Sequence, residues 1–137
     1  MLPLSLQDME VTMLKEQTRT SEIVRRGWDA VARGDWEALV ADYIEDMVFV
    51  MPGQADVLNG RAAFREALDG LGGLLPKGFS ISSIRQIGEG PEVVSIVEWT
   101  CDSIPEGSQL AVLFRFRGDK VAEERWFVDT EQWKAAF

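Results

Sequence analysis

Hydrophobic positions in the first part of the chain repeat with the period of a helix. Val24, Trp28 and Val31 lie four and then three positions apart, which places them on one helical face. This helix is predicted to begin before Met13 and to end at Gly34, because glycine readily adopts the left-handed conformation that closes a helix.

A second helix, a short strand and a third helix are predicted next. Asp35 is suited to the N-cap of the second helix, whose apolar positions are Trp36, Leu39, Val40, Tyr43 and Ile44. Residues 47–51 are apolar and partly β-branched, which favours a strand ending at Pro52. Asn59 is a suitable N-cap for the third helix, and the pair Gly72-Gly73 is predicted to end it.

The second half of the chain has the composition of strands. Four segments are rich in β-branched and aromatic residues and are separated by the turn sequences GEGP, IPEG and RGDK: residues 79–87, 93–101, 109–117 and 121–128. Short turns between successive strands predict an antiparallel meander. The fold class is therefore α+β, with N-terminal helices packed on one face of a strongly curved, mostly antiparallel sheet that encloses a cone-shaped cavity.

The composition fits one globular domain. The 137 residues are 46% hydrophobic and 27% charged, so a single domain is expected over residues 1–137, with an N-terminal arm of about residues 1–12. The net charge of −9 repels nucleic-acid backbones and anionic lipids. No apolar run approaches the roughly 20 residues of a membrane helix. Neither nucleic acid nor a membrane is an expected partner.

The absence of histidine limits the chemistry. With 0 His and 1 Cys, imidazole-dependent triads, the usual zinc sites and an internal disulfide are excluded. No nucleotide-binding motif or metal-ligand pattern is present, so no cofactor and no metal are expected. The lone cysteine indicates a reducing, cytoplasmic setting. Any acid or base must be a carboxylate, a lysine or a tyrosine.

The order of the predicted elements resembles the nuclear transport factor 2-like superfamily, and particularly its SnoaL-like branch, which is similar to polyketide cyclases. Four stretches within residues 23–137 carry the resemblance: VARGDWEALVADYIEDMVFVMPG, NGRAAFREAL, LFRFRGDKVAEERWFV and VDTEQW. The resemblance implies a cone-shaped α+β barrel. It does not fix an activity, because this superfamily holds unrelated chemistries in the same cavity.

Two known catalytic patterns of the superfamily are missing. The positions of the tyrosine and two aspartates of the steroid isomerases hold Gly27, Met51 and Val112. The positions of the limonene-epoxide-hydrolase set hold Trp99, Cys101, Phe49, Met51 and Asp129. Only Asp129 is retained, and it also falls where SnoaL-like cyclases place their acid/base aspartate. The resemblance therefore implies that Asp129 is the catalytic residue.

Strand periodicity gives the predicted orientation of Asp129. Alternation from Val121 places Glu123, Arg125, Phe127 and Asp129 on one face, which the resemblance assigns to the cavity. Burial among apolar groups would raise the pKa of Asp129 and suit it to proton transfer. The alternative is that Asp129 caps a helix beginning at Thr130, and the two roles are compatible.

A hydrophobic ligand is expected in the cavity. Predicted ligand-binding residues are Trp28, Tyr43, Phe49, Met51, Trp99, Cys101, Val112 and Phe127. Simple core packing is the alternative for all of them, and Cys101 is interpreted as an apolar filler and not as a nucleophile.

Two functions remain open on the sequence alone. The first is cofactor-independent acid/base catalysis, such as isomerisation, cyclisation or hydration, on a small hydrophobic molecule. The second is a module that binds a hydrophobic ligand or dimerises without turnover. A homodimer is expected in either case, with Leu113 and Trp126 on the outer face of the sheet, and Glu123 and Glu124 on a solvated face or at the edge of the dimer sheet.

Overall fold

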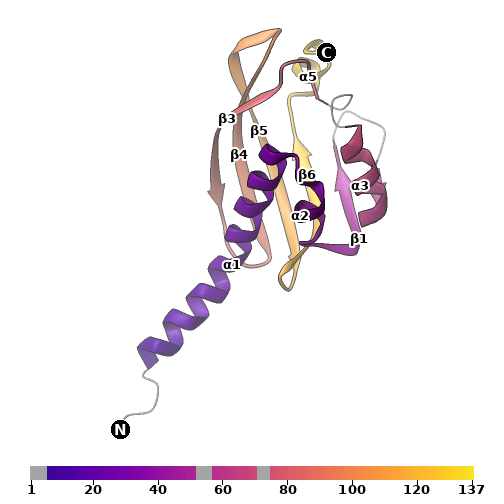
Figure 1. Cartoon of the computed structure of the whole chain (residues 1–137). Coiled ribbons are helices and arrows are strands. Elements are labelled where there is room, and N and C mark those ends of the chain that lie inside the picture. Colours follow the sequence, from indigo (N-terminus) through magenta and orange to yellow (C-terminus); the bar gives the residue numbers. More distant parts are fainter. Residues whose placement is uncertain (1–5, 52–56, 71–74) are drawn as a thin grey trace.

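One mixed sheet forms the body of the protein, and helices cover one of its faces (Figure 1). The structure is a computed structural model that describes residues 6–51, 57–70 and 75–137, and only the backbone of residues 6–19. The described helices are α1 (Leu6–Arg33), α2 (Trp36–Val40), α3 (Arg61–Asp69) and α5 (Thr130–Ala135). The described strands are β1 (Tyr43–Val50), β2 (Val57–Asn59), β3 (Ser80–Ile87), β4 (Glu92–Cys101), β5 (Ile104–Arg117) and β6 (Lys120–Phe127).

The sheet confirms the predicted meander. Within the described residues its strand order is β2-β1-β6-β5-β4-β3, and successive strands from β3 to β6 pair antiparallel. The pairing of β1 with β6 is parallel, which makes the sheet mixed but mostly antiparallel. The sheet is curved and open, so the α+β cone predicted from the sequence is the observed architecture (Figure 1).

The core lies between the helices and the inner face of the sheet. Along β4, burial alternates in strict period two, and Val93, Val97 and Trp99 are fully enclosed. The first turns of α1 project away from the body of the molecule, whereas its C-terminal half crosses the sheet (Figure 1).

The second predicted helix is shorter than its sequence pattern. Asp35 caps α2 as expected, accepting a hydrogen bond from the Ala38 amide at 3.1 Å, but the helix ends at Val40 and Tyr43 begins β1. The backbone amide of Val121 donates to the carbonyl of Asp42 at 2.8 Å, which ties this point of the chain to β6. Strand pairing therefore overrides a helical periodicity that continues through Tyr43 and Ile44.

The start of the third helix also differs from the prediction. Asn59 is the last residue of β2, and the N-cap position of α3 is Gly60, which has φ 99°. The Gly60 amide donates to the carbonyl of Met47 at 2.7 Å, so Gly60 still pairs with β1. The chain must turn into α3 directly after this contact. Glycine tolerates the required positive φ. The predicted end at Gly72-Gly73 lies outside the described residues, and the described helix ends at Asp69.

A β-bulge in β6 decides which side chains enter the core. Arg115 of β5 pairs with Glu123, but the next residue, Phe116, pairs with Val121, so Ala122 is an extra residue in the strand. The bulge reverses the alternation after Val121. Glu124 and Trp126 then face inwards together with Val121.

Candidate functional site

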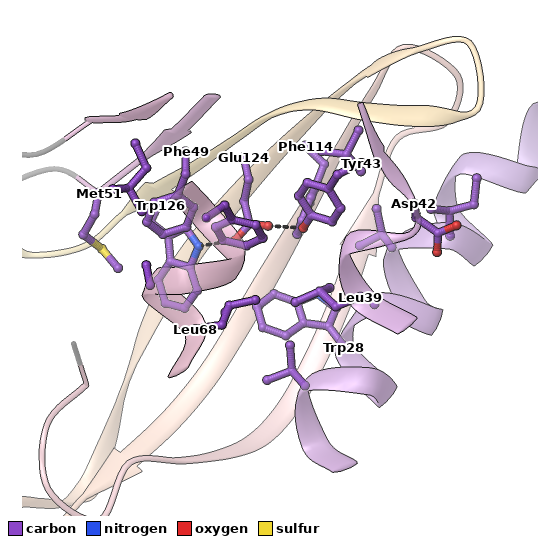
Figure 2. Close-up of a pocket in the computed structure, with 18 of the residues that line it drawn as sticks. Trp28, Leu39, Asp42, Tyr43, Phe49, Met51, Leu68, Phe114, Glu124 and Trp126 are labelled. Atoms are coloured by element: carbon purple, nitrogen blue, oxygen red, sulfur yellow. Dashed lines mark hydrogen bonds between the residues drawn. The ribbon is translucent and has the colours of Figure 1, made fainter. Parts of the chain in front are cut away.

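An apolar pocket lies between the helices and the inner face of the sheet (Figure 2). Its cavity volume is about 80 Å³. Residues of α1, α2 and α3 line it on one side, and residues of β1, β2, β3, β5 and β6 line it on the other. Most of the wall is hydrocarbon or aromatic, so a small apolar molecule is the ligand class that the pocket suits.

Stacked aromatic rings form two parts of the wall. Phe64 of α3 stacks on Tyr43 and on Phe49, each with a centroid separation of 5.2 Å. Trp28 of α1 meets Phe114 edge to face at 6.1 Å and lies 6.2 Å from Trp126. These contacts fix the rings in place, because aromatic pairs at such separations gain energy beyond the area they bury.

A single buried carboxyl group interrupts the apolar wall. Glu124 is 6% exposed, and Figure 2 shows its side chain between Tyr43 and Trp126. One carboxyl oxygen is hydrogen-bonded to the hydroxyl of Tyr43, and the other accepts from Nε1 of Trp126 at 2.8 Å. Both partners are uncharged groups.

The surroundings of Glu124 favour its protonated form. Burial raises the pKa of the Glu124 carboxyl above its usual value, and the hydrogen bonds from Trp126 and Tyr43 oppose this increase only in part. Burial also raises the pKa of Tyr43 well above its usual value, and the neighbouring Glu124 carboxylate adds to the effect. Tyr43 is therefore a neutral donor at physiological pH. Among the described residues that line the pocket, Glu124 is the carboxyl group whose pKa is raised, a feature that is frequent in groups that exchange protons.

A second carboxylate at the pocket wall is neutralised by an ion pair. The Asp42 carboxylate receives two hydrogen bonds from Arg26, from Nε at 3.0 Å and from a terminal nitrogen at 2.7 Å. In Figure 2 Asp42 lies on the far side of Tyr43 from Glu124. Such a bidentate pair is charge-assisted and geometrically specific. The two acids of the pocket therefore have different partners: Asp42 contacts a guanidinium group, and Glu124 contacts two neutral donors.

Four of the predicted ligand-binding residues lie in this pocket. Trp28, Tyr43, Phe49 and Met51 all line it. Their role in binding a ligand stays a prediction.

The other predicted ligand-binding residues lie elsewhere. Trp99, Cys101 and Val112 are buried in the core outside the pocket lining, and Trp99 packs against Phe79 and Trp133. Phe127 is 48% exposed. Its predicted inward orientation is wrong because the bulge at Ala122 reverses the alternation before it.

The predicted orientation of Asp129 is also wrong. The residue is exposed, and its side chain accepts a hydrogen bond from the Gln132 amide at 3.0 Å as the N-cap of α5. The capping alternative describes what the structure shows. The predicted burial of this carboxylate among apolar groups is absent, so the geometric support for proton transfer by Asp129 is lost.

Strict alternation along β6 also misplaced two other residues. Glu124, expected on a solvated face, is buried in the pocket, and Trp126, expected on the outer face, lines the pocket as well. The sequence did contain one signal: Val121 and Trp126, on either side of the acidic pair, lie five positions apart, a spacing that places both on one face only if an extra residue stands between them. Phe127 lies six positions from Val121 and fits unbroken alternation, so the two aromatic residues point to opposite conclusions.

Among the described residues, no group of acidic or cysteine side chains is arranged to hold a metal ion. None of the described helices combines the length and hydrophobicity needed to span a membrane.

An α+β cone with an apolar pocket and one buried acid defines the class of this protein. Residues 24–124 match the model of the SnoaL-like domain, and the chain belongs to that family. A comparison with curated protein sequences finds no match.

Three solved structures illustrate the likeness. A nuclear transport factor 2-like protein from Burkholderia xenovorans is 22% identical, with a TM-score of 0.71 over 88% of this chain and 96% of that one. A protein from Xanthomonas campestris named as a candidate polyketide cyclase is 21% identical, with a TM-score of 0.70 over 88% and 98%. TerC, co-crystallised with polyporic acid, is 18% identical, with a TM-score of 0.70 over 86% and 97%. At these identities the likeness establishes the fold alone.

Proposed function

We propose that the protein is a cofactor-independent acid/base catalyst that acts on a small hydrophobic molecule, with Glu124 as the proton carrier. The observation that carries this proposal is the buried carboxyl itself, which lies in an apolar pocket and contacts two neutral donors. A carboxyl whose pKa is raised towards neutrality is suited to take and return a proton at physiological pH.

The pocket supports a proton shift next to a carbonyl group. In its ionised form Glu124 takes a proton from the carbon between the carbonyl and the C=C bond of a β,γ-unsaturated ketone. The electron pair of that C–H bond forms a new C=C bond, and the π pair of the carbonyl moves to its oxygen. The protonated Glu124 then returns the proton to the γ-carbon as the carbonyl re-forms, which leaves the conjugated isomer. The Tyr43 hydroxyl and the Trp126 indole N–H stabilise the ionised form by hydrogen bonding.

The experiment is deuterium exchange into small ketones in heavy water, followed by NMR. Wild-type protein should exchange the protons beside the carbonyl, and Glu124→Gln should slow the exchange about 100-fold or more, because the amide cannot carry the proton. Asp129→Asn is the matched control: it changes an exposed acid that only caps α5 and should exchange at the wild-type rate. Equal rates for wild type and Glu124→Gln would contradict the proposal.

The second candidate is binding without turnover. Both oxygens of Glu124 already have partners, and a cavity of about 80 Å³ leaves little room for a reacting molecule and its motion. In that case wild-type protein would retain a small apolar ligand in native mass spectrometry and return it chemically unchanged.

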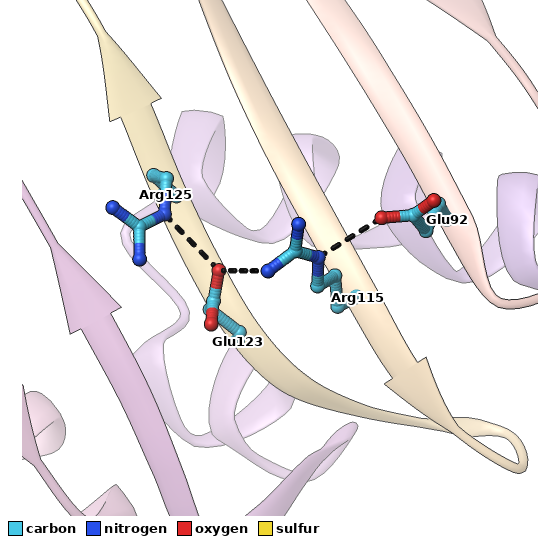
Figure 3. A network of polar contacts seen from close by, with 4 residues as sticks. All are labelled: Glu92, Arg115, Glu123 and Arg125. Atoms are coloured by element: carbon cyan, nitrogen blue, oxygen red, sulfur yellow. Dashed lines mark hydrogen bonds and ion pairs between the residues drawn. The ribbon is translucent and has the colours of Figure 1, made fainter.

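We expect a homodimer formed through the outer face of the sheet under either proposed function. An ionic network crosses this face from β4 to β6 (Figure 3): Arg115 pairs with Glu92 at 2.9 Å and with Glu123 at 3.2 Å, and Glu123 also pairs with Arg125 at 3.1 Å. The exposed ring of Phe127 lies on the same strand as Glu123 and Arg125. A light-scattering mass equal to one chain at micromolar concentration would contradict the dimer.

A cytoplasmic location is part of the proposal. The only cysteine, Cys101, is buried and free, which suits a reducing compartment.

A further inference from the structure

A second hollow lies beside the pocket, between α1 and β3. Its cavity volume is about 340 Å³, and unlike the pocket it is mostly polar. Arg25 and Asp29 of α1 face Ser82, Ser83 and Gln86 of β3 across it. We call this hollow the polar groove. A register shift between Ile81 and Ser83 marks a bulge in β3 at this point, and bulges often re-aim side chains next to binding sites.

Two residues line both the pocket and the polar groove. Trp28 from α1 and Ile81 from β3 are common to the two walls. Figure 2 shows the Trp28 indole at the edge of the pocket, opposite Glu124 and Trp126. Trp28 is half-buried, so its ring is a partition between an apolar space and a polar one.

A hydrogen bond holds the Trp28 partition in place. Its indole N–H donates to the hydroxyl of Ser95 at 3.0 Å. Ser95 is 0% exposed and lies on β4 between the buried residues Val93 and Val97. A buried hydroxyl in such a position is costly without a partner. The Trp28 indole satisfies it, and breaking this bond is part of the cost of moving the ring.

The volume of the pocket limits the size of the ligand that fits in it without using the polar groove. A dry cavity of about 150 Å³ binds benzene, and the pocket is smaller, at about 80 Å³. A ligand with more than a small apolar body must therefore extend beyond the pocket. The polar groove offers that room directly behind Trp28.

We propose that the polar groove is an extension of the pocket that opens when Trp28 leaves Ser95, and that the ligand is an amphipathic molecule with a small apolar head and an uncharged polar tail. This inference rests on the pocket being the binding site of the proposed function. The head lies near Glu124, and the tail lies in the groove.

The chemistry of the groove selects an uncharged tail. Arg25 and Asp29 supply one positive and one negative charge, so neither an anionic nor a cationic tail gains a net electrostatic advantage. Ser83 and Gln86 carry groups that both donate and accept hydrogen bonds. A hydroxyl or amide tail matches them.

The test compares two ketones that share a head. Butanone is smaller than benzene and has no tail, and 6-hydroxyhexan-2-one carries an uncharged hydroxyl tail on the same head. Calorimetry measures the dissociation constant of each for wild-type protein and the variants. Ser95→Ala removes the acceptor that holds Trp28 and should tighten binding of the tailed ketone about fivefold, while butanone binds as before. Trp28→Phe also removes the bond and should shift the ratio of the two constants in the same direction, which keeps the test decisive if Ser95→Ala fails to fold.

Two further variants distinguish binding in the polar groove from general effects of a substitution on the dissociation constants. Ser83→Ala removes a groove hydroxyl and should weaken binding of the tailed ketone severalfold without affecting butanone. Ser103→Ala, a serine near α5 that donates to the Ala136 carbonyl at 3.1 Å, is the matched control and should change neither constant.

Equal effects on the two ketones, or no effect on either, would overturn the proposed groove, as would failure of both ketones to bind. Failure of the proposed function looks different, because the ketones would then bind with the predicted pattern while deuterium exchange is absent in wild-type protein.

Discussion

Replacing Glu124 with glutamine is expected to remove a specific pH dependence of stability. The native pKa of Glu124 is raised by burial above the usual 4.5. The native protein therefore keeps this proton at pH values where the unfolded chain has lost it. The stabilising contribution is complete below about pH 4.5 and is lost as the pH rises through the native pKa. Glutamine cannot ionise, so its contribution stays constant.

The structure also indicates that glutamine fits the site. The amide oxygen can accept the Trp126 indole N–H, and the amide NH₂ can donate to the Tyr43 hydroxyl oxygen, so both hydrogen bonds of Glu124 have a replacement. The stability difference between the variants should be small at pH 5. It should then grow in favour of glutamine as the pH rises, by about 1.4 kcal/mol for each unit by which the native pKa exceeds the unfolded one.

Urea denaturation followed by tryptophan fluorescence at pH 5, 6, 7 and 8 measures the effect. Other carboxylates titrate equally in both proteins, so the difference between them isolates Glu124. Glu123→Gln is the matched control, because Glu123 lies on the outer face in ion pairs with Arg115 and Arg125 and its loss should leave the wild-type trend intact. A constant difference between wild type and Glu124→Gln at all four pH values would refute the raised native pKa of Glu124.

Three substitutions test other parts of the structure by the same denaturation assay. Phe64→Ala should cost about 3–5 kcal/mol, because the ring is 4% exposed and stacks on Tyr43 and Phe49; a loss below 1 kcal/mol would contradict this packing. Asp129→Ala should cost about 0.5–2 kcal/mol by removing the cap of α5, and Asp129→Asn should restore most of it. Gly88→Ala should cost about 1–3 kcal/mol, because Gly88 has φ 96° and a Cβ there would lie 2.7 Å from a backbone carbonyl oxygen; wild-type stability would show that this turn is not constrained.

The sequence predicted the architecture because the signals for the architecture are local. Four strands separated by short turns can pair only with their neighbours at low cost, and the observed meander from β3 to β6 follows that order. The boundary between α2 and β1 was not predictable in the same way. Tyr43 fits the helical period, and only the pairing of this segment with β6, distant in the sequence, makes it a strand.

The choice of acid depended on the parity of one strand. Four of the eight predicted lining residues lie in the pocket, whereas Trp99, Cys101 and Val112, which come from strands other than β6, are buried in the core outside it. Phe127 and Asp129 lie beyond Ala122, where a one-residue bulge moves every later side chain to the opposite face. Alternation from Val121 therefore predicted a cavity position for Asp129, whereas Glu124 is the acid of this segment that lines the pocket.

The residues of β6 give an energetic reason for the position of the bulge. An unbroken strand would bury Val121 and Phe127 but also Glu123 and Arg125, and burying two charges costs several kcal/mol for each ion unless their geometry is ideal. The bulge at Ala122 exchanges them for Trp126 and a single carboxyl. That carboxyl can lower its cost further by binding a proton. The extra residue therefore decides which of the two acids is buried: Glu124 enters the pocket beside Trp126, and Glu123 stays on the outer face.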